Sequence, residues 1–124
     1  MYSHFHLFNL GADVDDQGVR VRFAVKNTGD RAGKYVAQVY VSPVGDATAL
    51  GWEAPKRLCG FRKVSLQRGE AGEVSLRIEP RTLAVYDNAA KRWVIDEADY
   101  DFALSADSRH TAAHVKVHVA RQVL

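Results

Sequence analysis

The sequence predicts an all-β fold in which two antiparallel sheets pack face to face as a β-sandwich. Short runs alternate apolar and polar residues, turn signals separate the runs, and no window carries the apolar spacing of a long amphipathic helix. An odd number of antiparallel runs, each with one apolar face, favours two packed sheets over a closed barrel.

The first half of the chain contains four runs with strand character. Residues 18–26 alternate apolar and charged side chains, as in a strand that buries one face. Residues 34–42 are apolar on both faces, which predicts a central strand. Gly11 is expected to end the first run. The expected strands are residues 4–10, 18–26, 34–42 and 58–66.

The second half continues with shorter runs. Residues 67–70 predict a turn in which Gly69 supplies a positive φ angle, and residues 80–83 predict a single helical turn. The polar turn 88–91 separates two short runs. The expected strands are residues 73–79, 83–87, 92–95, 99–104 and 114–119.

Aromatic residues in the strand patterns are expected in the core, namely Tyr40, Phe61, Tyr86 and Trp93. The hydroxyl of Tyr86, just after the helical turn, is expected to tie a corner of the sandwich. The corner at Asn27 predicts a turn with Asx-type hydrogen bonds, since no helix follows that could cradle a phosphate.

Length and composition predict one domain that needs no disulfide or metal ion to hold its core. The chain has 124 residues, a net charge of +2, and a single cysteine that excludes an internal disulfide. Lys and Arg are spread among Asp and Glu without a basic stripe, so nucleic acid is not an expected partner. No apolar segment is long enough to span a membrane, and residues 1–4 lack the features of a signal peptide. The compartment stays open.

Several segments, in order, resemble the fibronectin type III-like domain of family 3 glycoside hydrolases. The motif Val-Lys-Asn-Thr-Gly-Asp-Arg-Ala-Gly at 25–33 is followed by a Gln-Val-Tyr-Val-Ser strand at 38–42. Pro-Lys-Arg-Leu-Cys-Gly-Phe-Arg-Lys-Val at 55–64 resembles the next signature of that domain. The remaining matching segments are residues 5–10, 67–70, 83–87, 92–95 and 100–105. The resemblance covers nearly the whole chain, and the order and spacing of the matching segments make it specific.

This resemblance implies an immunoglobulin-like, fibronectin type III-like sandwich over residues 1–124. Residues 1–17 would be a lead-in strand and turn, and 18–120 the sandwich proper. The family's enzymes are mostly β-glucosidases and related exo-glycosidases, and the domain follows the two domains that form the active site. The resemblance therefore implies that the chain itself is not catalytic, that the parent protein is, and that the partners are its catalytic domains. A parent in the periplasm or outside the cell would fit.

No catalytic residue, cofactor or metal site is predicted within the chain. A retaining glycosidase needs two carboxyl groups about 5 Å apart across a sugar, and the densest acidic cluster lies at residues 96–101. Strand alternation explains that cluster as a solvated outer face. His114 and His118 share a face but lie about 13 Å apart along a strand, too far to bind one ion together. Cys59, beside Gly60, is expected to be a small buried hydrophobe.

Trp52 is the one candidate contact residue. It lies in the long irregular segment 43–55, where a loop of that length is often functional. Its indole either tucks back onto the sandwich, docks on a partner domain, or stacks on a sugar. Three functions follow: an accessory domain that packs on and stabilises the catalytic domains, a carbohydrate-binding module that targets the enzyme to polysaccharide, and a free-standing adhesion or assembly domain.

Overall fold

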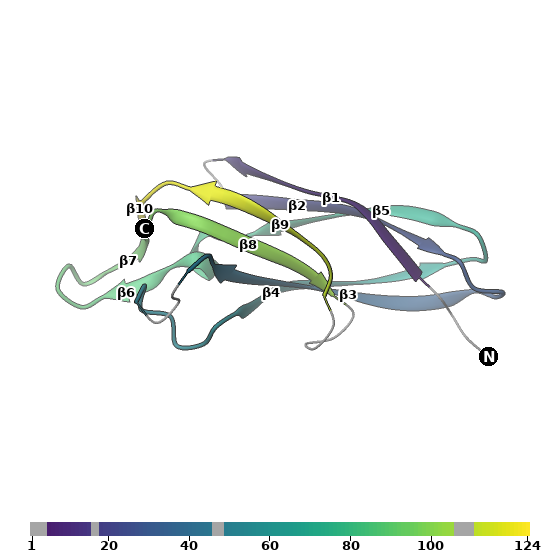
Figure 1. Cartoon of the computed structure of the whole chain (residues 1–124), viewed down its shortest axis with the longest axis horizontal. Coiled ribbons are helices and arrows are strands. Elements are labelled where there is room, and N and C mark those ends of the chain that lie inside the picture. The colour runs from purple at the N-terminus through teal and green to yellow at the C-terminus, as the bar shows by residue number, and fades with distance from the viewer. Residues whose placement is uncertain (1–4, 16–17, 46–48, 106–110) are drawn as a thin grey trace.

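The computed structural model describes residues 5–15, 18–45, 49–105 and 111–124, and it confirms an all-β antiparallel sandwich (Figure 1). One sheet has the order β1-β2-β5, with β1 at Phe5–Asp15, β2 at Gly18–Asn27 and β5 at Ala71–Ile78. The other has the order β4-β3-β8-β9. Its strands are β3 (Gly33–Pro43), β4 (Arg57–Leu66), β8 (Ala98–Ser105) and β9 (Thr111–Val119).

A small third sheet closes one end of the sandwich, at the left of Figure 1. It has the order β10-β7-β6, with β6 at Val85–Asp87, β7 at Arg92–Ile95 and β10 at Gln122–Val123. The expected helical turn is present as the 3₁₀ turn η1, Pro80–Leu83. No helix in the described part of the chain is long and apolar enough to cross a membrane.

The core lies between the two large sheets and follows the period-2 alternation of their strands. In β2 the residues at 19, 21, 23 and 25 face inward and are buried, while their charged neighbours are exposed. β3 pairs with β4 on one side and β8 on the other, so the predicted central strand is confirmed. The largest fully buried side chains are Tyr100, Phe102, Ile78, Leu83, Ile95 and Leu104.

Strand β1 is longer than the sequence predicted. The expectation that Gly11 ends it was wrong, because pairing with β2 resumes at Gly11 and Arg22 and continues to Asp15. A β-bulge between Phe8 and Gly11 accommodates one extra residue on β1, and Asn9 takes a positive φ of 56° there. Asn tolerates this left-handed conformation better than most residues.

The corner after β2 is held by one buried amide. The backbone N–H of Gly29 donates to Oδ1 of Asn27 at 2.9 Å, which confirms the predicted Asx turn. The Nδ2 group of Asn27 donates to the carbonyls of Arg31 and Leu66 at 2.9 and 3.1 Å. Asn27 is fully buried, so these bonds replace the water it gave up.

The tyrosine that ties a corner is Tyr100, and the prediction for Tyr86 was wrong. The hydroxyl of Tyr100 donates to the carbonyl of Asp96 at 2.8 Å. Burial, with the nearby negative charge of Asp96, raises the pKa of Tyr100 to about 12. Tyr86 is instead 46% exposed and meets Trp93 edge to face.

Candidate interaction surface

The outer face of β3 and β4 carries exposed apolar side chains. Val36 is 40% exposed, Leu58 is 51% exposed and Phe61 is 66% exposed. The expectation that Phe61 belongs to the core was therefore wrong. We call this surface the β3–β4 face, and it comprises Val36, Gln38, Tyr40, Leu58, Phe61 and Lys63.

A β-bulge in β4 brings Leu58 and Phe61 onto the same face. Phe61 pairs with Gln38, and Leu58 pairs with Tyr40, so Cys59 and Gly60 together span one step of β3. Gln38 and Tyr40 are two residues apart and share a face. Leu58 and Phe61, three residues apart, consequently lie side by side.

Cys59 lies in the bulge of β4, and its thiol is in an environment that makes it unreactive. The Sγ atom donates to the carbonyl of Val39 at 3.2 Å. Burial raises the pKa of the Cys59 thiol to about 12, so the thiol stays protonated at neutral pH. A nucleophilic role would need the thiolate, whereas this side chain is a partly buried, uncharged group that packs against the core.

The β3–β4 face is basic as well as apolar. Neither β3 nor β4 contains an Asp or Glu, and Lys34 and Lys63 point to the same side as Val36. The ammonium group of Lys56 lies 4.6 Å from the centre of the Tyr40 ring. The hydroxyl of Tyr40 donates to Oε1 of Gln38 at 2.7 Å. The surface therefore combines apolar contact area with positive charge.

Next to Leu58 lies a pocket of about 420 Å³, which we call the end pocket. Its lining residues are Glu53, Arg57, Leu58, Arg81, Thr82, Ala84 and Trp93. They come from the loop before β4, from β4 itself, from η1 and its C-terminal flank, and from β7. Because Leu58 belongs to both, the end pocket and the β3–β4 face form one continuous surface.

Arg57 organises the end pocket through its guanidinium group. It donates to the carbonyls of Thr82 and Ala84 at 2.9 and 2.8 Å, and it pairs with both carboxylate oxygens of Glu53 at 3.0 and 2.9 Å. These hydrogen bonds lower the pKa of Glu53. The same guanidinium stacks 3.9 Å from the centre of the Trp52 ring. Arg57 thus joins the long loop to η1, a role the sequence did not reveal.

Of the three positions considered for Trp52 from the sequence, the structure has the one in which the indole packs back onto the sandwich. It is only 4% exposed, with the Arg57 guanidinium on its ring and the Tyr100 ring 6.2 Å away. An indole buried in this way anchors its loop on the sandwich. Contact of Trp52 with a partner domain or a sugar stays a prediction, and it would require the loop to open.

Arg81 is a second guanidinium in the end pocket, and it stacks 4.3 Å from the centre of the Trp93 ring. Among the residues that the structure describes, no carboxylate pairs with this guanidinium, in contrast to Arg57. Trp93 packs partly against the core, and Tyr86 meets its edge. Arg81 therefore offers several donors to an incoming acceptor.

The other half of the four-stranded sheet carries the acidic cluster on its outer face. Nδ1 of His118 contacts Asp99 at 2.8 Å and its Nε2 contacts Glu97 at 3.3 Å, while His114 contacts Asp101 at 3.1 Å. The hydrogen bonds to Asp99 and then Glu97 raise the pKa of His118. Within the described residues no group of three or more His, Cys, Asp or Glu is placed to hold a metal ion.

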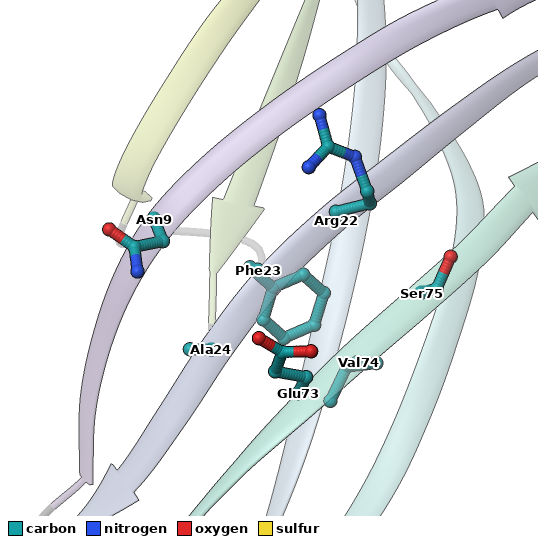
Figure 2. Close-up of a pocket in the computed structure, with 7 residues that line it drawn as sticks. All are labelled: Asn9, Arg22, Phe23, Ala24, Glu73, Val74 and Ser75. Atoms are coloured by element: carbon teal, nitrogen blue, oxygen red, sulfur yellow. The ribbon is translucent and has the colours of Figure 1, made fainter.

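The three-stranded sheet has a groove of about 520 Å³ whose lining is mixed, with Phe23 and Val74 beside four polar residues (Figure 2). Asn9 comes from β1, Arg22 and Ala24 from β2, and Glu73 and Ser75 from β5. Ala24 pairs with Glu73, and its small side chain leaves room between the flanking strands. Arg22 is held at the groove by Asp13 at 3.0 Å.

Together these features define an immunoglobulin-like β-sandwich domain with a basic, partly apolar sheet face. A family model described as a fibronectin type III-like domain matches residues 35–108. The chain belongs to this Fn3-like family, and it matches the C-terminal region of family 3 β-glucosidases.

Curated relatives are much longer than this chain. It is 40% identical over 90 residues to a protein named probable β-glucosidase G from Emericella nidulans, covering 73% of this chain and 11% of that protein. It is 34% identical over 110 residues to a β-glucosidase from Rhizobium radiobacter, covering 88% of this chain and 13% of that protein.

Solved structures give the same picture. β-Glucosidase 3B from Thermotoga neapolitana, in complex with α-D-glucose, matches with a TM-score of 0.85 and 31% identity over 99% of this chain and 17% of its own. The family 3 β-glucosidase from Bifidobacterium adolescentis matches with a TM-score of 0.86 and 27% identity over 97% of this chain and 18% of its own. In these enzymes the matching domain is one part of a multidomain chain.

Proposed function

We propose that this chain works as a non-catalytic accessory domain of a family 3 glycoside hydrolase, where it packs on the catalytic domains and stabilises them. In this proposal residues 1–124 act as one domain, and the parent enzyme hydrolyses O-glycosyl bonds of β-glucosides or related substrates. The observation that carries the proposal is the match of nearly the whole chain to a small part of each solved β-glucosidase.

The chemistry of the chain supports a structural role. The carboxylates of Asp99, Asp101 and Glu97 contact histidines on an outer sheet face, whereas a retaining glycosidase places two carboxyl groups across a bound sugar. The partly buried thiol of Cys59 stays protonated at neutral pH. The β3–β4 face supplies the kind of exposed apolar surface that accompanies domain packing.

Two measurements test this proposal. The purified chain should release no p-nitrophenol from an aryl β-glucoside beyond a heat-treated control. A hybrid enzyme, in which this chain replaces the matching domain of Thermotoga neapolitana β-glucosidase 3B, should resist thermal inactivation better than the same enzyme without any such domain. Turnover by the isolated chain, or equal inactivation rates of the hybrid and truncated enzymes, would refute the proposal.

Carbohydrate binding is a second candidate, favoured by the polar groups that line the groove of Figure 2. Its amide, guanidinium, carboxylate and hydroxyl groups are all able to bond to sugar hydroxyls. The test is retardation of the chain in native gels containing soluble glucan or xylan, compared with Glu73→Gln and with Ala24→Leu, which fills the groove. Unchanged mobility of all three proteins would exclude this function.

A further inference from the structure

We infer that the β3–β4 face and the end pocket form the surface that meets the catalytic domains, and that the partner surface is apolar with an acidic rim. This inference rests on the proposed function, and it specifies which side of the sandwich is covered and what chemistry covers it. The observations that carry it are the exposed Phe61 and Leu58, the basic composition of β3 and β4, and the Arg81–Trp93 stack.

Several outward-facing charges elsewhere on the two large sheets have partners within the chain. On the three-stranded sheet, Arg22 pairs with Asp13 and Arg77 pairs with Asp15 at 3.0 and 3.1 Å. On the β8–β9 half of the four-stranded sheet, His114 and His118 contact acidic residues. These basic side chains meet carboxylates of the same chain, whereas the β3–β4 face presents exposed apolar groups together with Lys34 and Lys63.

Phe61 and Leu58 supply the apolar part of the proposed contact. An aromatic ring that is 66% exposed leaves most of its apolar surface in water, and the neighbouring Leu58 is 51% exposed. Phenylalanine is enriched at the centres of protein interfaces, where such area is removed from water. The bulge of β4 places the two side chains together, so one partner surface can cover both.

Positive charge sets the character of the partner. Lys34 and Lys63 flank the apolar residues, and no acidic residue lies on either strand. Arg81 is braced by the Trp93 ring with its guanidinium edge available for a carboxylate. Complementary charge across an interface fixes register and excludes wrong partners. An Asp or Glu of the partner is therefore expected in the end pocket.

The same charges argue against a second copy of this chain as the occupant. A two-fold symmetric contact would bring each β3–β4 face against its equivalent, and the lysines of both copies would then face one another. The catalytic domains are the favoured occupant because the matching domain in the Thermotoga neapolitana enzyme makes up only 17% of its chain. Most of such an enzyme is thus available to cover this face.

Thiol labelling tests which side is covered. Phe61→Cys is compared with Ser75→Cys, whose new thiol lies on the outer side of the three-stranded sheet, in the isolated chain and in the hybrid enzyme. Cys59 gives little background because its thiol is partly buried and stays protonated at neutral pH. We expect Phe61→Cys to react about tenfold more slowly in the hybrid, and Ser75→Cys to react within about twofold of its rate in the isolated chain. Labelled peptides are identified by mass.

Each other outcome overturns the inference. Equal labelling of Phe61→Cys in both contexts would show that the face is open in the enzyme. Protection of Ser75→Cys instead would place the contact on the other sheet. Protection of Phe61→Cys in the isolated chain that grows with protein concentration would identify a second copy as the occupant. The inactivation rates of hybrid and truncated enzymes report on the proposed function separately.

The acidic rim is tested in the hybrid enzyme with Arg81→Gln and Lys63→Gln, against Arg20→Gln on the opposite sheet. The first two variants should inactivate faster than the unmodified hybrid, and the difference should shrink at high salt, because screening weakens the contact between the charges. Rates equal to that of Arg20→Gln would overturn the charge assignment. As a control, the isolated chains that carry Arg81→Gln or Lys63→Gln should melt at the same temperature as the unmodified chain. Faster inactivation of the hybrid then arises at the interface between the domains.

Discussion

Asn27 concentrates the hydrogen bonding of an entire corner in one buried residue. Its side chain accepts from Gly29 and donates to Arg31 and Leu66, and its backbone pairs with Glu70 and Gly69 across the β4–β5 turn. The amide suits this position because it carries a donor group and an acceptor group together. The turn after β2 and the end of β4 are thereby fixed relative to each other.

Replacing Asn27 with Ala should lower the free energy of unfolding by about 2 to 3 kcal/mol, since buried polar groups lose their partners. Urea denaturation of the isolated chain measures this change. Arg68→Ala, an exposed change in the same turn region, should stay within about 0.5 kcal/mol of the wild type. Equal stability of Asn27→Ala and wild type would mean that water replaces these bonds at no cost.

His118 should titrate above its ordinary pKa of 6.5, because Asp99 and then Glu97 stabilise its protonated ring. A raised folded pKa means that the pair's stabilisation is fully present below pH 6.5 and disappears as pH rises through the folded pKa. NMR titration of the imidazole protons measures the shift. Asp99→Asn should lower the pKa more than Glu97→Gln does, and a wild-type pKa at or below 6.5 would contradict the contact.

At the scale of the element, two phenylalanines of the four-stranded sheet, on the strands that flank β3, lie on opposite faces. Phe102 in β8 is 0% exposed, whereas Phe61 in β4 lies on the outer face. Phe102→Ala should destabilise the isolated chain by about 3 to 5 kcal/mol through loss of burial and creation of a cavity. Phe61→Ala should cost less than about 1 kcal/mol, as expected for an exposed position. Thermal denaturation of both variants measures the two losses of stability. Similar losses would contradict the faces assigned to the two rings.

The sequence determined the strands well because most of them keep strict alternation, as β2 and β5 do. It failed at bulges, where one extra residue reverses the faces without any unusual composition. The β1 bulge at Asn9 hid the continuation to Asp15, and the β4 bulge hid the fact that Leu58 and Phe61 lie on the same face. For Phe61 a signal was available: it lies at odd spacing from Val64 and Leu66, so alternation places it on the opposite face.

The end pocket was beyond sequence reasoning for a different reason. Its residues come from four separate parts of the chain, and only the fold brings Arg57 to Thr82 and Arg81 to Trp93. The sequence did single out the loop that carries Trp52, through its length and its large aromatic residue. It missed that Arg57, five residues further on, holds that indole in place.

For the whole molecule, the small end sheet and the two large sheets are expected to unfold together. Leu83, Ala84 and Ile95 are buried in the common core, and Arg57 links β4 to the carbonyls of Thr82 and Ala84. Trp52 lies in that core and Trp93 lies in the end sheet, so the two indoles report on different parts.

Urea unfolding is therefore followed by tryptophan fluorescence and by far-ultraviolet circular dichroism, for the wild type and for Trp93→Phe. In Trp93→Phe, Trp52 is the only tryptophan. We expect both methods to give the same urea midpoint for each protein. Arg57→Met should uncouple the end sheet, because Thr82 and Ala84 lose their shared donor while the methionine retains apolar contact with Trp52. In Arg57→Met, which keeps Trp93, the tryptophan fluorescence should change at a lower urea concentration than the circular dichroism does. Separate midpoints in the wild type would show that the end sheet is an independent unit, and coincident ones in Arg57→Met would show that core packing alone joins it to the sandwich.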